Sequence, residues 1–97
     1  MKLLAIETEL KNIEEDIMSA LLKDEATAVL ELKSKGTIKE IYFNEKHCAV
    51  IILESKSIVS AKHTLNKLPL VNKGYISFKI MELNPYTGFE RLGRFNE

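Results

Sequence analysis

The chain of 97 residues is long enough for one domain, and with 45% hydrophobic and 29% charged residues its composition is that of an ordinary globular protein. Fourteen basic and 14 acidic residues cancel, so no net field attracts nucleic acid or anionic lipid, and we expect neither nucleic acid nor membrane as a partner. The lone Cys48 excludes an internal disulfide, and no apolar run suits a signal peptide or a membrane span. We therefore expect a soluble, cytoplasmic protein.

The first half of the chain predicts a strand followed by a long helix. Residues 2 to 8 contain a short apolar run that is typical of a strand. Asn12 precedes Glu15 by three positions, which is the spacing of a capping box at a helix N-terminus. Apolar side chains then recur at helical spacing until Gly36, which stands where a C-terminal cap belongs. This pattern predicts a helix over residues 12 to 35.

A hairpin and a second helix follow. Residues 37 to 43 are rich in β-branched and aromatic side chains, residues 44 to 47 are polar, and residues 48 to 53 are apolar at every position. Together these segments predict a β-hairpin. Ser57 is the expected N-cap of the second helix, and Pro69 lies just past its expected end.

The last predicted strand covers residues 75 to 83, after a turn at Gly74. Two sets of side chains alternate along it, and alternate residues of a strand lie on opposite faces. We expect the first set to face the helices and the second to face away from them. The first set is Ile76, Phe78 and Ile80, and the second is Tyr75, Ser77 and Lys79.

The predicted element order is β-α-β-β-α-β, which is that of a ferredoxin-like α+β fold with helices on one face of a four-stranded antiparallel sheet. A sheet covered on one side should have alternating strands, yet residues 48 to 53 are apolar throughout. This strand therefore needs cover on its second face as well. Because no predicted element is left to supply it, we expect a second copy to pack sheet against sheet in a homodimer.

The chain is expected to divide into the ferredoxin-like domain, residues 1 to 84, and a C-terminal tail, residues 85 to 97. The tail combines aromatic side chains such as Phe89 with arginines such as Arg91. Both residue types are enriched at protein interfaces. We expect the tail to pack at a subunit interface.

Four motifs follow one another along the chain: Asp24-Glu25, Gly36-Thr37 after the first helix, His47 after the hairpin turn, and Leu68-Pro69-Leu70. This pattern resembles muconolactone isomerase and its small relatives, which belong with the YCII-like proteins to the dimeric α+β barrel superfamily. The tail Leu83-Asn84-Pro85-Tyr86-Thr87-Gly88-Phe89 is similar to that of other isomerase-like relatives. The resemblance extends over residues 20 to 92.

The resemblance implies a dimeric barrel, in the isomerases assembled into larger oligomers, with a small-molecule cavity between sheet and helices. Muconolactone isomerases move a proton on an unsaturated lactone without metal or cofactor. Glu25 falls at the position of a family carboxylate and would be the base, and His47 would orient or share the proton. The tail departs from the polar Cys-Arg-His-Pro-type ending of those isomerases, which leaves the substrate open.

Each candidate residue also has a plain structural interpretation. Glu25 could be a solvated acid on a helix, and His47 could be a polar residue of a turn. Tyr42, Tyr75 and Tyr86 are candidate ligand contacts, since a buried phenol keeps a usable hydroxyl. The sequence has no metal-ligand spacing, glycine-rich phosphate loop or nucleophile elbow.

These observations favour a small-molecule-binding protein that acts as a cofactor-independent isomerase on a small unsaturated lactone or enol acid. Two alternatives remain open at this point. One is a non-catalytic metabolite-binding or assembly module of the same fold. The other is a cofactor-free monooxygenase-like enzyme. In all three, we expect no metal or cofactor, and the partners are a second copy of the chain and a small organic molecule.

Overall fold

The structure is a computed structural model that describes residues 1–93; the last four residues of the predicted tail lie outside the described residues. The elements run β1 (Lys2–Glu9), α1 (Glu15–Ser34), β2 (Ile38–Phe43), β3 (Ala49–Glu54), α2 (Ile58–Leu65), α3 (Pro69–Asn72), β4 (Ile76–Glu82) and the 3-10 turn η1 (Gly88–Leu92). The four strands form one antiparallel sheet in the order β2-β3-β1-β4. The predicted ferredoxin-like fold is confirmed.

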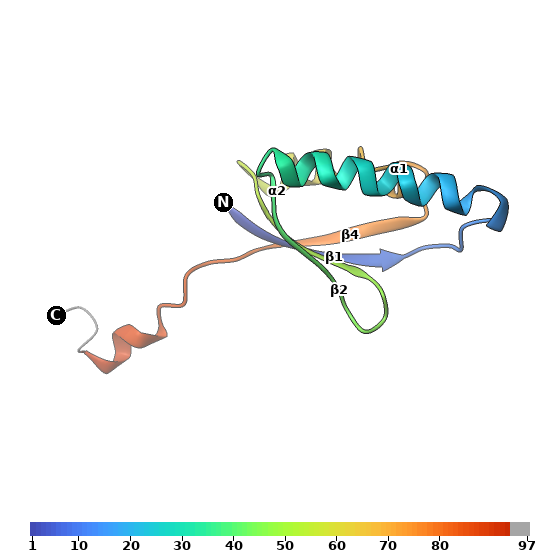
Figure 1. The fold of residues 1–97 in the computed structure, drawn as a ribbon. Helices are drawn as coiled ribbons and strands as arrows, with labels where there is room; N and C mark the ends of the chain where they lie inside the picture. The colour runs from blue at the N-terminus through green and yellow to red at the C-terminus, as the bar shows by residue number, and fades with distance from the viewer. Residues whose placement is uncertain (94–97) are drawn as a thin grey trace.

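The helices cover one face of the sheet, and in Figure 1 the opposite face has no element against it. Side chains of β1 and β3 alternate between these faces. Leu3, Ala5, Ile51 and Leu53 are buried in the main core with residues of α2. Their neighbours on the helix-free face are only half-buried and are also apolar: Leu4, Ile6, Val50 and Ile52. The prediction that β3 is apolar on both faces is therefore confirmed, while the dimer that it implies stays a prediction.

Two of the predicted helix ends are confirmed. Gly36 has a φ of 80°, and the N–H groups of Gly36 and Thr37 donate to the carbonyls of Lys33 and Leu32 at 3.1 and 3.0 Å. This is a Schellman ending, which needs a left-handed residue and therefore favours glycine. At the start of α2, the Ser57 side chain accepts a hydrogen bond from the N–H of Ser60 at 3.0 Å.

The start of α1 differs from the prediction. Asn12 is not the N-cap of α1, because the helix begins at Glu15 with Glu14 as its flanking residue. The N–H groups of Leu10 and Lys11 instead bond to the carbonyl of Tyr75, so this segment continues along the sheet before it turns. Pro69 lies past the end of α2, as predicted, and it also opens the short helix α3, as its fixed φ permits at a first helical position.

The tail leaves the body of the molecule after β4, as Figure 1 shows, and ends in η1. The rings of Tyr86 and Phe89 meet edge to face with centroids 4.9 Å apart, and both side chains are exposed. The packing of this tail against another subunit stays a prediction. None of the helices within residues 1–93 is long and apolar enough to cross a membrane.

Candidate active site

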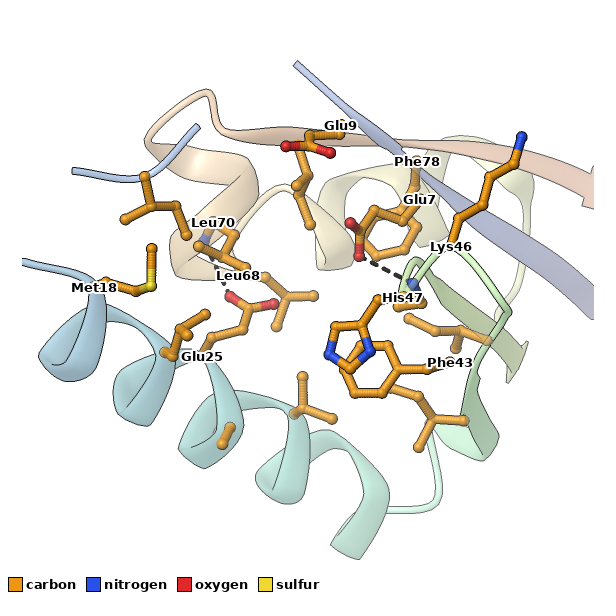
Figure 2. Close-up of a pocket in the computed structure, with 18 of the residues that line it drawn as sticks. Glu7, Glu9, Met18, Glu25, Phe43, Lys46, His47, Leu68, Leu70 and Phe78 are labelled. Atoms are coloured by element: carbon orange, nitrogen blue, oxygen red, sulfur yellow. Dashed lines mark hydrogen bonds between the residues drawn. The ribbon is translucent and has the colours of Figure 1, made fainter. Parts of the chain in front are cut away.

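A cavity of about 1010 Å³ lies between α1 and the covered face of the sheet (Figure 2). This volume is at the upper end of the range for small-molecule sites, and the wall is mainly apolar. Its apolar lining comes from the helix, the sheet and the segment around α3, and it includes Met18, Leu22, Val29, Ile41, Ile51, Leu68, Leu70, Ile76 and Phe78.

The cavity exists because α1 is held near its two ends and spans the sheet between them. Toward its start, Leu21 packs in a small cluster with Leu70 and Tyr75. Toward its end, Val29 and Leu32 pack against the main core. Between and beside these contacts, α1 borders the cavity with side chains from Glu15 to Lys33.

Glu25 is a half-buried carboxylate on the cavity side of α1. Its Oε1 accepts a hydrogen bond from the backbone N–H of Leu70, in the first turn of α3, at 3.0 Å. Burial raises the pKa of the Glu25 carboxyl, the bond from Leu70 opposes this, and the charge of Glu7 raises the pKa further. Burial and the nearby like charge both disfavour the ionised form of Glu25. Its carboxylate is therefore a stronger base than an exposed carboxylate.

Glu7 is a second carboxylate in the same cavity, and it was not among the site residues predicted from the sequence. Its Oε1 accepts a hydrogen bond from the backbone N–H of Ala49 on β3 at 3.0 Å. The sequence signal for Glu7 is the alternation of buried and outward side chains along β1, because Leu3, Ala5 and Glu7 follow one another on the same strand face. A charged residue that continues a buried face is a candidate site residue.

His47 lies at the cavity wall beyond the tip of the β2–β3 hairpin, where Figure 2 shows its ring stacked on that of Phe43. The ring centroids are 4.0 Å apart, and the planes differ by 17°. His47 has a φ of 62°, a left-handed conformation that is uncommon outside glycine. The side chain of Asn44 holds the turn by accepting bonds from the N–H groups of Lys46 and Cys48, each at 2.9 Å.

The cavity brings together Glu25, His47 and Tyr42 among the five predicted site residues. The Tyr42 side chain is largely exposed, and its hydroxyl donates to Glu40 at 2.6 Å. Tyr75 and Tyr86 do not line the cavity. Tyr86 lies in the tail.

Tyr75 departs from the predicted strand alternation, because it precedes β4 and belongs to the turn that follows α3. It is buried against Leu21 and Leu70, and its hydroxyl donates to Glu14 at 2.5 Å. That bond is the main reason why the pKa of Tyr75 is raised and the pKa of Glu14 is lowered. The prediction that Tyr75 shares an outward face with Ser77 and Lys79 is therefore wrong.

The cavity carboxylates have no cationic partner within the part of the chain that the structure describes. The ion pairs there are Glu54 with the N-terminus and Glu31 with Lys35, and neither involves a cavity acid. Lys11, at the cavity rim, places its Nζ 4.7 Å from the centre of the Tyr75 ring. Across residues 1–93, no group of three or more His, Cys, Asp or Glu side chains is arranged to hold a metal ion.

The fold and cavity together define an α+β protein with a small-molecule pocket over a four-stranded sheet. No protein-family model matches the chain, and no curated protein matches its sequence at a significant level. Among solved structures, muconolactone isomerase superposes with a TM-score of 0.75 at 19% identity, over 90% of this chain and 92% of that one.

A second similar structure is 5-chloro-2-hydroxyhydroquinone dehydrochlorinase from Burkholderia phenoliruptrix AC1100, solved in complex with 2,5-dihydroxybenzoquinone. It superposes with a TM-score of 0.61 at 12% identity, over 91% of this chain and 98% of that one. At these identities the comparisons show the fold. The resemblance to muconolactone isomerase is therefore confirmed at the level of the fold.

Proposed function

We propose that this protein binds a small organic molecule and isomerises it by cofactor-independent proton transfer, with an unsaturated lactone or an enol acid as substrate. One observation carries the proposal. Glu25 is a half-buried carboxylate in a largely apolar cavity of small-molecule size, anchored through one oxygen to the Leu70 amide. A base of this kind is held in position while its second oxygen is left to react.

The reaction needs only this base and a group that stabilises the intermediate. The Glu25 carboxylate removes a proton from the carbon beside the lactone carbonyl, and the electron pair of that C–H bond delocalises into a dienolate. The carboxyl proton of Glu25 exchanges with water in the open cavity. Glu25 then donates a proton to the far carbon of the conjugated system, which shifts the double bond and regenerates the carboxylate. The raised pKa of Glu25 brings its basicity closer to neutral pH, where such a base works best.

His47 is proposed to orient the substrate and to share the proton. Its ring stands at the cavity wall and is supported from behind by the Phe43 ring. An imidazole N–H can donate to the enolate oxygen as negative charge develops there. Tyr42 is proposed as a contact at the cavity rim.

We further propose that the working unit is a homodimer in the cytoplasm. The helix-free sheet face presents half-buried apolar side chains from two central strands, Leu4, Ile6, Val50 and Ile52. A second copy packed on this face would remove them from water. The tail, residues 85 to 97, is proposed to contribute to contacts between subunits.

Non-catalytic ligand binding is the second candidate, and the bond between Glu25 and Leu70 favours it. The same carboxylate satisfies a backbone N–H in the first turn of α3, which gives Glu25 a structural role without any chemistry. Under this alternative the cavity holds a metabolite and Glu25 only shapes the wall.

Solvent deuterium exchange separates the two candidates. Muconolactone and its methyl ester are incubated with the protein in D2O, and exchange at the ring carbons is followed by proton NMR. Proton transfer predicts exchange by the native chain and a loss of about 10²- to 10⁴-fold in Glu25→Gln. Asp24→Asn is the matched control, because Asp24 is exposed and borders a different hollow of the surface. Binding without exchange would favour the non-catalytic module, and equal exchange by Glu25→Gln would contradict the role of Glu25.

A further inference from the structure

Glu7 occupies the place where the β1–β3 ladder ends. The last paired residues of these strands are Ile6 and Val50, and the next N–H on β3 is that of Ala49. The Glu7 side chain accepts the bond from this N–H at 3.0 Å. One carboxylate oxygen is therefore held at a strand end, and Figure 2 shows the side chain directed into the cavity that also holds Glu25.

The charged groups around the cavity come from four segments, and only Glu7 and Glu25 among them are half-buried. Strand β1 contributes Glu7 and Glu9, and the loop after it contributes Lys11. Helix α1 contributes Glu15, Glu25 and Lys33, and the β2–β3 hairpin contributes Lys46 and His47. The Nζ of Lys11 lies over the Tyr75 ring, and Figure 2 shows Lys46 extending away from Glu25. No ion pair within residues 1–93 neutralises Glu7 or Glu25.

The two carboxylates act on each other through the cavity. Both side chains line the same cavity and neither has an ion-pair partner among residues 1–93, and the charge of Glu7 raises the pKa of Glu25. A ligand that carries its own carboxylate would bring a third negative charge into this partly dry space. Like charges in such surroundings repel much more strongly than they do in water.

From this arrangement we propose that Glu7 is a specificity-determining residue, which together with Glu25 makes the cavity select uncharged enolisable substrates over substrates that carry a carboxylate. This inference rests on the proposed function and narrows its substrate class to the uncharged lactones. The apolar wall suits the ring of such a lactone, and the second oxygen of Glu7 is an acceptor for a hydroxyl or an acidic C–H of the ligand.

Binding of a charged and an uncharged lactone of nearly equal shape tests the proposal. The probes are muconolactone and its methyl ester, titrated by calorimetry into the full chain and into Glu7→Gln. Glutamine keeps an acceptor for the Ala49 N–H while it removes the charge. We expect the native chain to prefer the ester by about tenfold or more, and Glu7→Gln to reduce this preference by about tenfold. Asp24→Asn removes a charge outside the cavity and should keep the native preference.

Equal binding of the two lactones by the native chain, or an unchanged preference in Glu7→Gln with an intact thermal unfolding transition, would overturn the proposal. Failure of both lactones to bind at millimolar concentration would overturn it too. Failure of the proposed function gives a different result, namely selective binding without deuterium exchange. Where exchange occurs, the pH at which the rate rises should move downward in Glu7→Gln, because loss of the Glu7 charge lowers the pKa of Glu25. A purely structural role for Glu7 would leave that pH unchanged.

Discussion

Replacing Glu25 by alanine or by glutamine should change stability in different directions. In Glu25→Ala the half-buried N–H of Leu70 loses the acceptor that lies 3.0 Å away. A buried donor left without a partner costs about 1–3 kcal/mol, and the open cavity, which admits water, favours the lower end of that range. One kcal/mol corresponds to roughly 4–8 °C in Tm for a domain of this size. Glu25→Gln keeps an acceptor and should avoid this loss.

The difference in free energy of unfolding between Glu25→Gln and the native chain should depend on pH. The pKa of Glu25 is raised in the folded state, so the folded state holds its proton more tightly than the unfolded state does. The stability that this protonation provides is present below the unfolded pKa, about 4.3, and is lost as pH rises through the folded pKa. Glu25→Gln should therefore match the native chain at acid pH and become the more stable of the two at neutral pH.

Urea denaturation at a series of pH values from 4 to 8, at one fixed protein concentration, measures both effects. The reasoning would be refuted if Glu25→Gln were destabilised as much as Glu25→Ala at pH 7. It would also be refuted if the difference between Glu25→Gln and the native chain were the same at every pH. The first result would mean that the bond from Leu70 does not stabilise the fold, and the second that burial of the Glu25 charge does not affect stability.

Three further substitutions test local features of the fold. Ser57→Ala removes the side-chain acceptor at the start of α2 and should lower the free energy of unfolding by about 1 kcal/mol, as measured by urea denaturation. An unchanged free energy of unfolding would show that this cap does not stabilise the helix. His47→Gly removes the backbone strain of a left-handed non-glycine residue and also removes the imidazole ring, so Tm should rise while ligand binding weakens. A lower Tm would show that stacking of the ring on Phe43 stabilises the fold by more than the strain costs. Ile52→Lys places a charge on the helix-free sheet face and should yield monomers in analytical ultracentrifugation, unless the dimer forms elsewhere.

The elements themselves follow from local patterns in the sequence. The alternation and composition of residues 37 to 53 predict the hairpin, and Gly36 and Ser57 mark helix ends by the backbone conformation or hydrogen bond that each one supplies. Where the prediction was wrong, a distant residue had intervened. Asn12 fails as a cap because the preceding segment bonds to Tyr75, and Tyr75 leaves the strand pattern because it bonds to Glu14.

The cavity depends on contacts that local patterns do not contain. Period-two alternation places Glu7 on the covered face of its strand, and helical spacing together with family resemblance singles out Glu25. That these two carboxylates share one cavity follows from how α1 is held over the sheet. The N–H that anchors Glu7 is 42 residues away, and the N–H that anchors Glu25 is 45 residues away. Residue type and spacing are local properties of the chain, whereas the burial and charge that make a carboxylate a base arise only when distant segments pack together.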